Sequence, residues 1–415
     1  MFLKPFRSLT PAQWRTFSAC FLAWSLDAFD FFLLTFCLDS IAATFGVSLA
    51  TAADSITWTL CMRPVGALLF GLLAEKIGRR PTLMINVLCF SIFGMASAFA
   101  PTFTSFLVMR ALFGVAMGGE WGVGAALALE SLPAESRGFF SGLLQEGYMA
   151  GSLLAAAAYG AIYPHLHAHG FLTKWRMLFL LGGLPAAVAA FIAFGVEESP
   201  AWKKGGARSH GDSYRALWKS LPLLCFLFLL MFGFNSFSHG TQDLYPTFLK
   251  HDKGLSVQAT AVVSMLGTIG AFAGGILAGS LSERFGRRRT IVMSVLLAVP
   301  VIPLWIWSHT AAMLAVGGFL MQMMVQGAWG VIPIHLNELS PGPVRAILPG
   351  LAYQMGNLLS SRNGHYQALA AQSLCHGRLA PVLGWTVVFC AVWIAVVASL
   401  GREARGPDLS GAESA

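Results

Sequence analysis

An internal duplication constrains the fold of this chain more than any other feature of its sequence. Residues 71–80, GLLAEKIGRR, return at residues 279–288 as GSLSERFGRR. The offset is 208 residues (279 − 71), about half of the 415-residue chain, and it relates Trp121 to Trp329 without a gap. A long internal period in an apolar chain predicts two similar halves.

The composition places both halves in a membrane. The chain is 56% hydrophobic and 11% charged, whereas typical soluble domains are about 25% charged. About 20 apolar residues span a bilayer as a helix. We therefore predict an all-α membrane protein with twelve transmembrane helices in two pseudo-symmetric six-helix bundles. The predicted segments are residues 15–38, 52–74, 82–100, 103–130, 139–163, 175–196, 220–249, 257–281, 290–308, 311–338, 345–372 and 380–400.

One polar stretch divides the chain. Residues 197–219, which include Lys203, Lys204, Arg208 and Arg215, predict a cytoplasmic linker between an N-terminal bundle, 1–196, and a C-terminal bundle, 220–415. The short polar tail after residue 402 is expected to be disordered. Most basic residues lie in alternate loops and the termini, which predicts a cell-membrane protein with both termini in the cytoplasm. The exceptions are Lys174, Arg176, Lys250, Lys253 and Arg378 in the opposite loops and Arg63, Arg110 and Arg362 in apolar segments.

The duplicated segments resemble a known loop signature. Both fit Gly-x-x-x-(Asp/Glu)-(Arg/Lys)-x-Gly-Arg-(Arg/Lys), which is similar to the motif between helices 2 and 3, and 8 and 9, of the major facilitator superfamily. Carboxylates in such a motif can face a helix N-terminus, where the helix dipole favours an anion. We expect the charged residues of the motif and its surroundings to form an inner-face latch and not a substrate site. They are Glu75, Arg79, Arg80, Glu130 and Arg137, with the repeats Glu283, Arg287, Arg288, Glu338 and Arg345.

Ionisable residues inside the apolar segments need an explanation, since each costs about 2.5–3.5 kcal/mol on insertion scales. Some of them could pair and hold helices together, but packing alone does not need so many. At the repeat offset Arg63 corresponds to Ala271 and Arg110 to Gly318, and such unduplicated charges are candidates for substrate or proton handling. The full set is Asp27, Asp30, Arg63, Arg110, Glu120, Glu146, His239, Asp243 and Arg362.

The seventh segment carries the most specific polar pattern, NSFSHGTQDLYPT at residues 235–247. At about 100° per residue, one stripe of the helix holds five of its polar side chains. His239 and Asp243 are i,i+4 neighbours that can hydrogen-bond. A histidine beside a carboxylate suits a proton carrier near neutral pH. The stripe consists of Asn235, Ser238, His239, Gln242 and Asp243.

This string resembles the Asn-x-x-(Ser/Thr)-His-x-(Ser/Thr)-Gln-Asp-x-x-x-Thr signature of the lactate/pyruvate:proton permeases, in the sialate:proton symporter family of the superfamily. Every defined position matches. DAFDFF at 27–32 resembles the Asp-x-x-Asp element of organic-acid:proton symporters, and YQMGNL at 353–358 resembles a helix 11 element of the permeases. Arg362 departs from the small residue expected there. The resemblance implies that Arg63, His239, Gln242, Asp243, Gln354 and Asn357 line the substrate path.

These features together predict a secondary active transporter that moves a small lactate- or pyruvate-like carboxylate with protons by alternating access. An arginine can bind a carboxylate through two parallel hydrogen bonds. The expected substrate-binding residues are Arg63, Asn235, Ser238, His239, Gln242, Gln354, Asn357 and Arg110. The expected proton-coupling residues are Asp27, Asp30, His239, Asp243, Glu120 and Glu146.

Other functions stay open at this point. Sialate and other larger organic acids also present a carboxylate, so the residues predict the charge of the substrate and not its size. A drug or metabolite exporter is an alternative, although antiporters of the superfamily usually carry Gly-Pro late in helix 5, where Gly151 is followed by Ser152. A membrane receptor without transport is the remote alternative, because the cytoplasmic segments are too short for an output domain.

We expect no enzyme activity, cofactor or metal, with protons as the coupling ion. The chain shows no nucleotide-binding loop or nucleophile triad, and its seven cysteines match no zinc-site spacing. His165, His167 and His169 alternate in a loop without nearby carboxylate or cysteine partners. Basic residues do not gather on one face, which argues against nucleic acid. The expected partners are the carboxylate, the proton and the lipid bilayer, and the protein is expected to be monomeric.

Overall fold

The structure is a computed structural model that describes residues 9–207, 209–404 and 409, and these residues are almost entirely helical. Arg208 of the predicted linker and most of the predicted disordered tail lie outside the described residues. The first half contains α2 (Pro11–Phe45), α3 (Leu49–Ile77), α4 (Arg79–Ser97), α5 (Phe103–Ser131), α6 (Arg137–Gln145), α7 (Gly147–Ala161), α8 (Lys174–Phe179) and α9 (Pro185–Gly195). The linker contains α10 (Pro200–Gly205) and α11 (His210–Lys219). The second half contains α12 (Leu221–Gln242), α13 (Tyr245–His251), α14 (Val257–Phe285), α15 (Arg287–Ala298), α16 (Ala311–Leu339), α17 (Leu348–Ser360), α18 (Asn363–Leu374) and α19 (Leu379–Leu400).

These helices make twelve crossings in two bundles, so the predicted fold class is confirmed. Among the described residues, ten helical spans are long and apolar enough to cross a membrane. The other two crossings are helix 5, which is α6 followed by α7, and helix 11, which is α17 followed by α18. Large apolar side chains remain exposed on the outer faces, among them Phe194 at 93% and Trp385 at 72%, and lipid contact accounts for exposure on this scale.

Helices 5 and 11 depart from the unbroken segments predicted at 139–163 and 345–372. Helix 5 is interrupted at Glu146, directly before Gly147, which weakens a helix. Helix 11 is interrupted at residues 361 and 362. There the Ser361 hydroxyl donates to the carbonyl of Leu358 at 2.7 Å, a local bond of the kind that competes with helix continuation.

The duplication seen in the sequence repeats in the helix starts. Ser48 accepts a hydrogen bond from the backbone N–H of Thr51 at 3.1 Å at the start of α3. Ser256, 208 residues later, accepts one from Ala259 at 3.2 Å at the start of α14. Thr102 and Thr310 cap α5 and α16 in the same way. Each capping side chain satisfies a backbone donor that the first helical turn leaves free.

The duplicated motif also sets a direct connection between consecutive helices. Gly78 joins α3 to α4 with a φ of +107°, and Gly286 joins α14 to α15 with a φ of +92°. A side chain at these backbone angles is strained, so glycine is needed at both positions. The motif therefore turns the chain by a single residue in each half.

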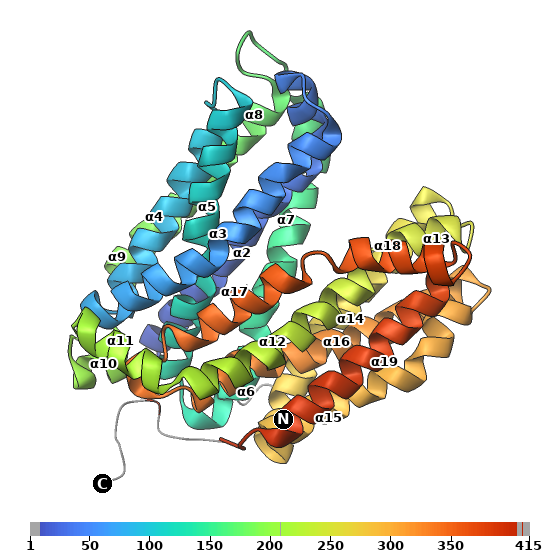
Figure 1. Ribbon diagram of the computed structural model, residues 1–415. Helices are drawn as coiled ribbons and strands as arrows, with labels where there is room; N and C mark the ends of the chain where they lie inside the picture. Colours follow the sequence, from blue (N-terminus) through green and yellow to red (C-terminus); the bar gives the residue numbers. More distant parts are fainter. Residues whose placement is uncertain (1–8, 208, 405–408, 410–415) are drawn as a thin grey trace.

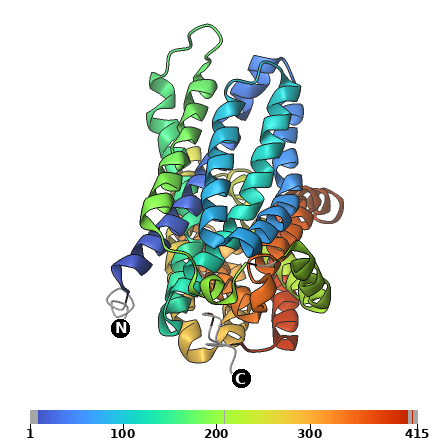
Figure 2. The same ribbon diagram turned by 90° about the vertical axis from the view of Figure 1, so that its left-hand side faces the viewer.

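The two halves meet at one end of the molecule and diverge toward the other (Figure 1). At the first end α6 packs against α14 and α16, while α17 packs against α3 and α5. We call this the closed end and the opposite one the open end. The linker helices lie at the closed end, where α2 begins and α19 ends, and Figure 2 shows the same arrangement from the side. Helices 5 and 11 thus cross between the halves.

Candidate functional site: a cavity between the two halves

A cavity of about 710 Å³ lies between the halves. Its walls come from α2, α3 and α7 in the first half and from α12, α14, α16 and α17 in the second. A volume of this size lies within the range of about 300–1,000 Å³ typical of small-molecule sites. The position between two bundles that touch at only one end makes it the candidate substrate site.

The polar stripe predicted for the seventh segment lies on α12 and forms one wall of this cavity. Its five members, Asn235, Ser238, His239, Gln242 and Asp243, all line it. They share one face because α12 continues without a break through residue 242. The sequence therefore located this wall through helical periodicity alone.

The histidine of this wall is held through both ring nitrogens. His239 Nδ1 lies 3.1 Å from Asp243 Oδ2, and Nε2 lies 3.1 Å from Asn357 Oδ1 on α17. The carboxylate accepts from the ring in either protonation state. An amide can present its oxygen to an imidazolium or its NH₂ group to a neutral imidazole. The site can therefore hold His239 charged or neutral without losing a hydrogen bond.

The tenth crossing, α16, extends this wall with two amides that the sequence analysis did not identify. Gln322 Oε1 accepts from Gln242 Nε2 at 2.9 Å, and Gln326 Nε2 lies 3.5 Å from the Ser238 hydroxyl. Both glutamines line the cavity. Two amides at i,i+4 in an otherwise apolar stretch of this helix were a signal that the same periodicity argument could have used.

Arg63 on α3 supplies the cation of the cavity. It is the only lysine or arginine among the described lining residues, and its side chain is almost wholly enclosed. Its Nε and Nη2 groups have no hydrogen-bond partner within the described part of the chain. Its guanidinium carbon lies 5.7 Å from the ring centroid of Tyr353 on α17. Arg63 therefore places a planar cation in the cavity wall, with two buried donors that have no hydrogen-bond partner among the described residues.

The remaining charged candidates of the first half lie outside the cavity lining. Asp27, Asp30, Glu120 and Arg110 are buried in the first half. Electrostatic interactions join Asp27 to Arg63 and Arg110, Asp30 to Arg110, and Glu120 to Arg63. The guanidinium carbon of Arg110 lies 4.0 Å from the Phe113 ring centroid. The sequence placed Arg110 with the substrate-binding residues, but the structure places it behind the cavity wall.

Gln354 and Glu146 also differ from the predicted arrangement. Both are completely buried and neither lines the cavity, whereas Asn357, one turn from Gln354, does. Neither side chain has a hydrogen-bond partner among the residues that the structure describes. Glu146 lies at the interruption of helix 5 and against Gly275 of the second half, so it belongs to the contact between the halves.

The family is shown by comparison with known proteins. The sequence profile described as Major Facilitator Superfamily matches residues 20–361. The chain belongs to the major facilitator superfamily. Its relatives carry transporter names, so the protein is a transporter and not an enzyme, as predicted.

A carboxylic acid transporter protein homolog of Saccharomyces cerevisiae is 30% identical over 86% of this chain, and the chain spans 61% of that protein. A probable 4-methylmuconolactone transporter of Cupriavidus pinatubonensis is 27% identical over 86% of this chain and 83% of its own length. The proton:xylose symporter XylE, solved with 6-bromo-6-deoxy-D-glucose, has a TM-score of 0.77 at 17% identity. That match covers 96% of this chain and 98% of XylE and shows a shared fold.

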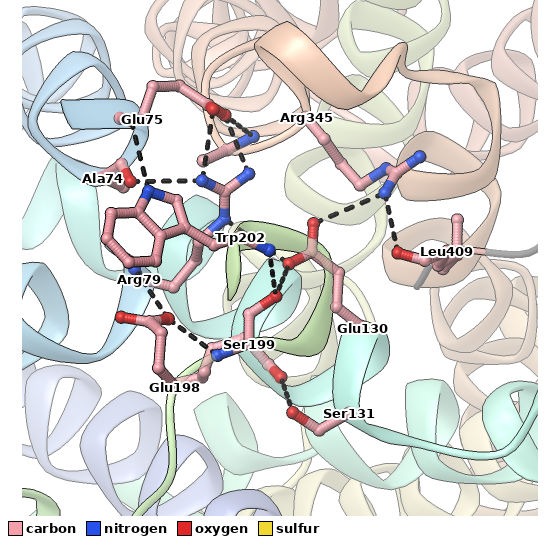
Figure 3. Close-up of polar contacts among 12 residues, drawn as sticks. Ala74, Glu75, Arg79, Glu130, Ser131, Glu198, Ser199, Trp202, Arg345 and Leu409 are labelled. Carbon is pink, nitrogen blue, oxygen red and sulfur yellow. Dashed lines mark hydrogen bonds and ion pairs between the residues drawn. The ribbon is translucent and has the colours of Figure 1, made fainter. Parts of the chain in front are cut away.

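The motif charges of this superfamily member gather at the closed end (Figure 3). Arg79 contacts Glu75 at 3.0 Å and Glu130 at 3.4 Å. Arg345 of the second half reaches Glu130 at 3.5 Å and donates to the backbone carbonyl of Leu409 at 3.1 Å. The Glu130 carboxylate also accepts from the Ser199 hydroxyl. These contacts join the first half, the linker, the second half and the tail.

The second copy of the motif forms a similar cluster. Arg287 contacts Glu283 at 3.0 Å and Glu338 at 2.9 Å. The Glu283 carboxylate accepts from the backbone N–H of Gly138 at 2.5 Å, in the first turn of α6. Arg137 donates to a backbone carbonyl of its own half at 3.1 Å. Each motif carboxylate therefore contacts the other half, since Glu75 accepts from the N–H of residue 346 at 3.4 Å.

Two carboxylates missed by the sequence analysis complete these clusters. Glu198 accepts from the backbone N–H of Arg79 at 3.0 Å at the start of α4. Glu403 accepts from Arg287 at 2.7 Å and from Arg288 at 3.1 Å at the start of α15. Burial raises the pKa of Glu198, and the backbone donors oppose that rise. Arg80 donates to a backbone carbonyl near the end of α9, and Arg288 donates to one near the end of α19.

The loop histidines set aside in the sequence analysis lie in the connection between α7 and α8, with His165, His167 and His169 exposed. Within residues 9–207, 209–404 and 409, no group of three or more histidine, cysteine, aspartate or glutamate side chains is placed to hold a metal ion. Arg362 is exposed at the interruption of helix 11 and does not line the cavity.

Proposed function

We propose that this transporter carries a small lactate- or pyruvate-like carboxylate together with protons, by alternating access, and that it belongs to the sialate:proton symporter family. The observation that carries the proposal is Arg63, a cation in the cavity with two free N–H donors. Nε and Nη2 lie on one edge of a guanidinium, and this edge matches the two oxygens of a carboxylate. The carboxylic acid transporter name of the yeast relative supports the same charge class.

Proton coupling follows from the charge balance behind the cavity wall. Asp27, Asp30 and Glu120 interact with two guanidinium groups, those of Arg63 and Arg110. Three ionised carboxylates and two cations would leave one uncompensated buried charge, so this cluster holds a proton at rest. A carboxylate bound to Arg63 adds another negative charge. Because burying unpaired charge is costly, each bound anion favours uptake of a further proton.

His239 provides a proton site in the cavity itself. Its hydrogen bonds to Asp243 and Asn357 allow it to be charged or neutral. It stands on the second half, whereas Arg63 stands on the first. An anion between them contacts both halves, so its arrival and departure are linked to the relative position of the bundles. We place the protein in the cell membrane as a monomer with both termini in the cytoplasm.

A larger organic acid is the second candidate substrate. A cavity of about 710 Å³ exceeds the needs of an acid with a few heavy atoms and suits a ligand of drug size. Phe31, Phe32, Tyr148, Trp329 and Tyr353 all line it. Aromatic rings stack well on flat, unsaturated ligands. The 4-methylmuconolactone transporter named among the relatives points to the same class.

Uptake into proteoliposomes across a panel of acids tests the proposal and separates the candidates. With an acidic exterior, we expect labelled carboxylates to accumulate and a protonophore to abolish accumulation. Lactate and pyruvate represent the first candidate, and ring-bearing acids such as benzoate the second. Accumulation driven equally by a sodium gradient at constant pH, without proton dependence, would contradict the proposal. Uptake of uncharged analogues at the same rate as the acids would contradict the role of Arg63 in binding a carboxylate.

A further inference from the structure

The contact between the halves at the closed end contains a buried acid that the proposed transport mechanism does not use. Glu146 lies at the interruption between α6 and α7, on the face of helix 5 that crosses to the second half. It is 0% exposed, and neither carboxyl oxygen has a hydrogen-bond partner among the described residues. Such a group is expected to be neutral, because an ionised carboxylate without partners is not stable in an apolar interior.

The carboxyl group rests directly on the backbone of the other half. A Cβ added to Gly275 of α14 would lie 2.2 Å from Glu146 Oε1. One turn earlier on helix 5, a Cβ on Gly142 would lie 2.2 Å from the carbonyl oxygen of the same Gly275. The backbones of α6 and α14 therefore touch, and no room remains for water around the acid. Only when the halves separate here can Glu146 meet solvent.

The internal repeat supplies a matched position without the acid. At the 208-residue offset Gly142 corresponds to Gly350, and Gly275 of α14 corresponds to Ala67 of α3. A Cβ on Gly350 would lie 3.9 Å from the Ala67 side chain, so the corresponding crossing is less close. Glu146 corresponds to Gln354, which is equally buried and equally without partners among the described residues. Gln354 has nearly the shape of a protonated glutamic acid but cannot ionise. The two crossings thus occupy corresponding positions in the repeat, and only the one in helix 5 carries a titratable group there.

The surroundings of Glu146 contain other titratable groups, but none compensates it. Glu283 on α14 and Glu338 on α16 are paired with Arg287. His335 on α16 is buried and makes no hydrogen bond to any described residue, Glu146 included. On the first-half elements packed nearby, Asp27 and Asp30 of α2 and Glu120 of α5 interact with Arg63 or Arg110.

We propose that Glu146 is a further proton-binding site, separate from the substrate cavity and from the cluster behind its wall. Glu146 must be protonated for helix 5 and α14 to close against each other. Protonation stabilises the closed end, and loss of the proton after the halves separate holds that end open. The inference rests on the proposed alternating access but not on the identity of the substrate. Protonation of Glu146 makes the closing of this end dependent on pH even when no substrate is bound.

Distance measurements on purified full-length protein in lipid nanodiscs test this directly, without substrate. Spin labels at Ala168, in the α7–α8 loop, and at His251, at the end of α13, report how far the halves diverge at the open end. The native cysteines would first be replaced, with transport checked afterwards. A long distance at the open end corresponds to a closed opposite end. In the wild-type protein we expect the long-distance population to grow as pH falls from about 8 to about 5. Buried carboxyl groups commonly titrate within this range.

Three variants decide the origin of that dependence. Glu146→Gln reproduces the neutral side chain of the repeat position, so the long distance should dominate at every pH. Gln354→Glu adds a second acid at the equivalent contact, so closing should require lower pH than in the wild type. Glu197→Gln removes an exposed acid, whose side chain is 66% exposed, and should leave the pH response unchanged.

The outcomes are distinct. A wild-type pH response in Glu146→Gln would overturn the proposal. If that variant does not fold, Gln354→Glu alone decides: a shift to lower pH supports the proposal, and an unchanged response overturns it. If the wild-type protein transports none of the acids, the proposed function is contradicted. The distance measurement still decides the role of Glu146, because it is made without substrate.

Discussion

Replacement of Arg63 by lysine is the substitution with the sharpest expected effect on substrate binding. Lysine keeps the positive charge but replaces a planar fork with a single ammonium group. Arg63 lines the cavity, and two of its donors, Nε and Nη2, have no hydrogen-bond partner among the described residues. The variant therefore retains the ion pair with a carboxylate and loses one of two charge-assisted hydrogen bonds.

The size of the loss can be estimated from that count. A hydrogen bond to a charged group contributes about 1.5–3 kcal/mol. Since 1.4 kcal/mol corresponds to a factor of ten in affinity, we expect the dissociation constant to rise at least about tenfold. The interaction of Arg63 with the ring of Tyr353 also weakens with an ammonium group, which adds to the loss.

The assay is equilibrium binding of the best transported acid to purified protein, with uptake kinetics on the same preparation. Arg362→Lys is the matched control, because Arg362 is exposed at the interruption of helix 11 and lies away from the cavity lining. The control should bind like the wild type. Unchanged affinity in Arg63→Lys, at equal abundance, would refute the assignment of the carboxylate to this arginine.

Further substitutions test the proton site, the cavity wall and the turn between α3 and α4. Asp243→Asn should reduce net uptake more than carboxylate exchange. Adding His239→Ala should cause little further loss, because the effects of residues that act as a unit are not additive. Equal loss of net uptake and exchange in folded protein would argue against proton transfer by this pair. Gln322→Leu leaves Gln242 without its 2.9 Å partner and should weaken substrate binding in a titration without lowering thermal stability. Gly78→Ala forces a side chain into a φ of +107° and should destabilise by about 1–3 kcal/mol, whereas Gly160→Ala, with open space around it, should not; thermal unfolding in detergent compares the two, and equal stability would show that the backbone angle is not restrictive.

The sequence predicted the fold because the relevant signals are local or repeated. Apolar length marked the crossings, and the 208-residue offset marked the halves. The stripe of helix 7 was predictable because α12 is a regular helix, so spacing along the chain converts directly into a shared face. His239 and Asp243 were placed correctly as hydrogen-bonded neighbours for the same reason.

The parts that the sequence did not predict depend on contacts between distant segments. Arg110 looked equivalent to Arg63 as an unduplicated cation, but the tilt and packing of α5 place it behind the cavity wall. Glu146 lies against Gly275 of the second half and not on the cavity lining, because α6 packs directly on α14. Gln322 lines the cavity and bonds to Gln242 across two helices, and only its i,i+4 spacing from Gln326 could have indicated this from the sequence. The roles assigned to these residues remain predictions.

Simultaneous recording of proton and carboxylate movement tests the central claim most directly. Proteoliposomes with a pH-sensitive dye inside, and no imposed gradient, would receive a labelled acid that the wild-type protein transports. The account predicts that the interior acidifies as the anion enters, in a fixed ratio, at a rate that depends on protein and exceeds passive entry of the free acid in protein-free liposomes. Carboxylate entry without protein-dependent acidification would contradict proton symport.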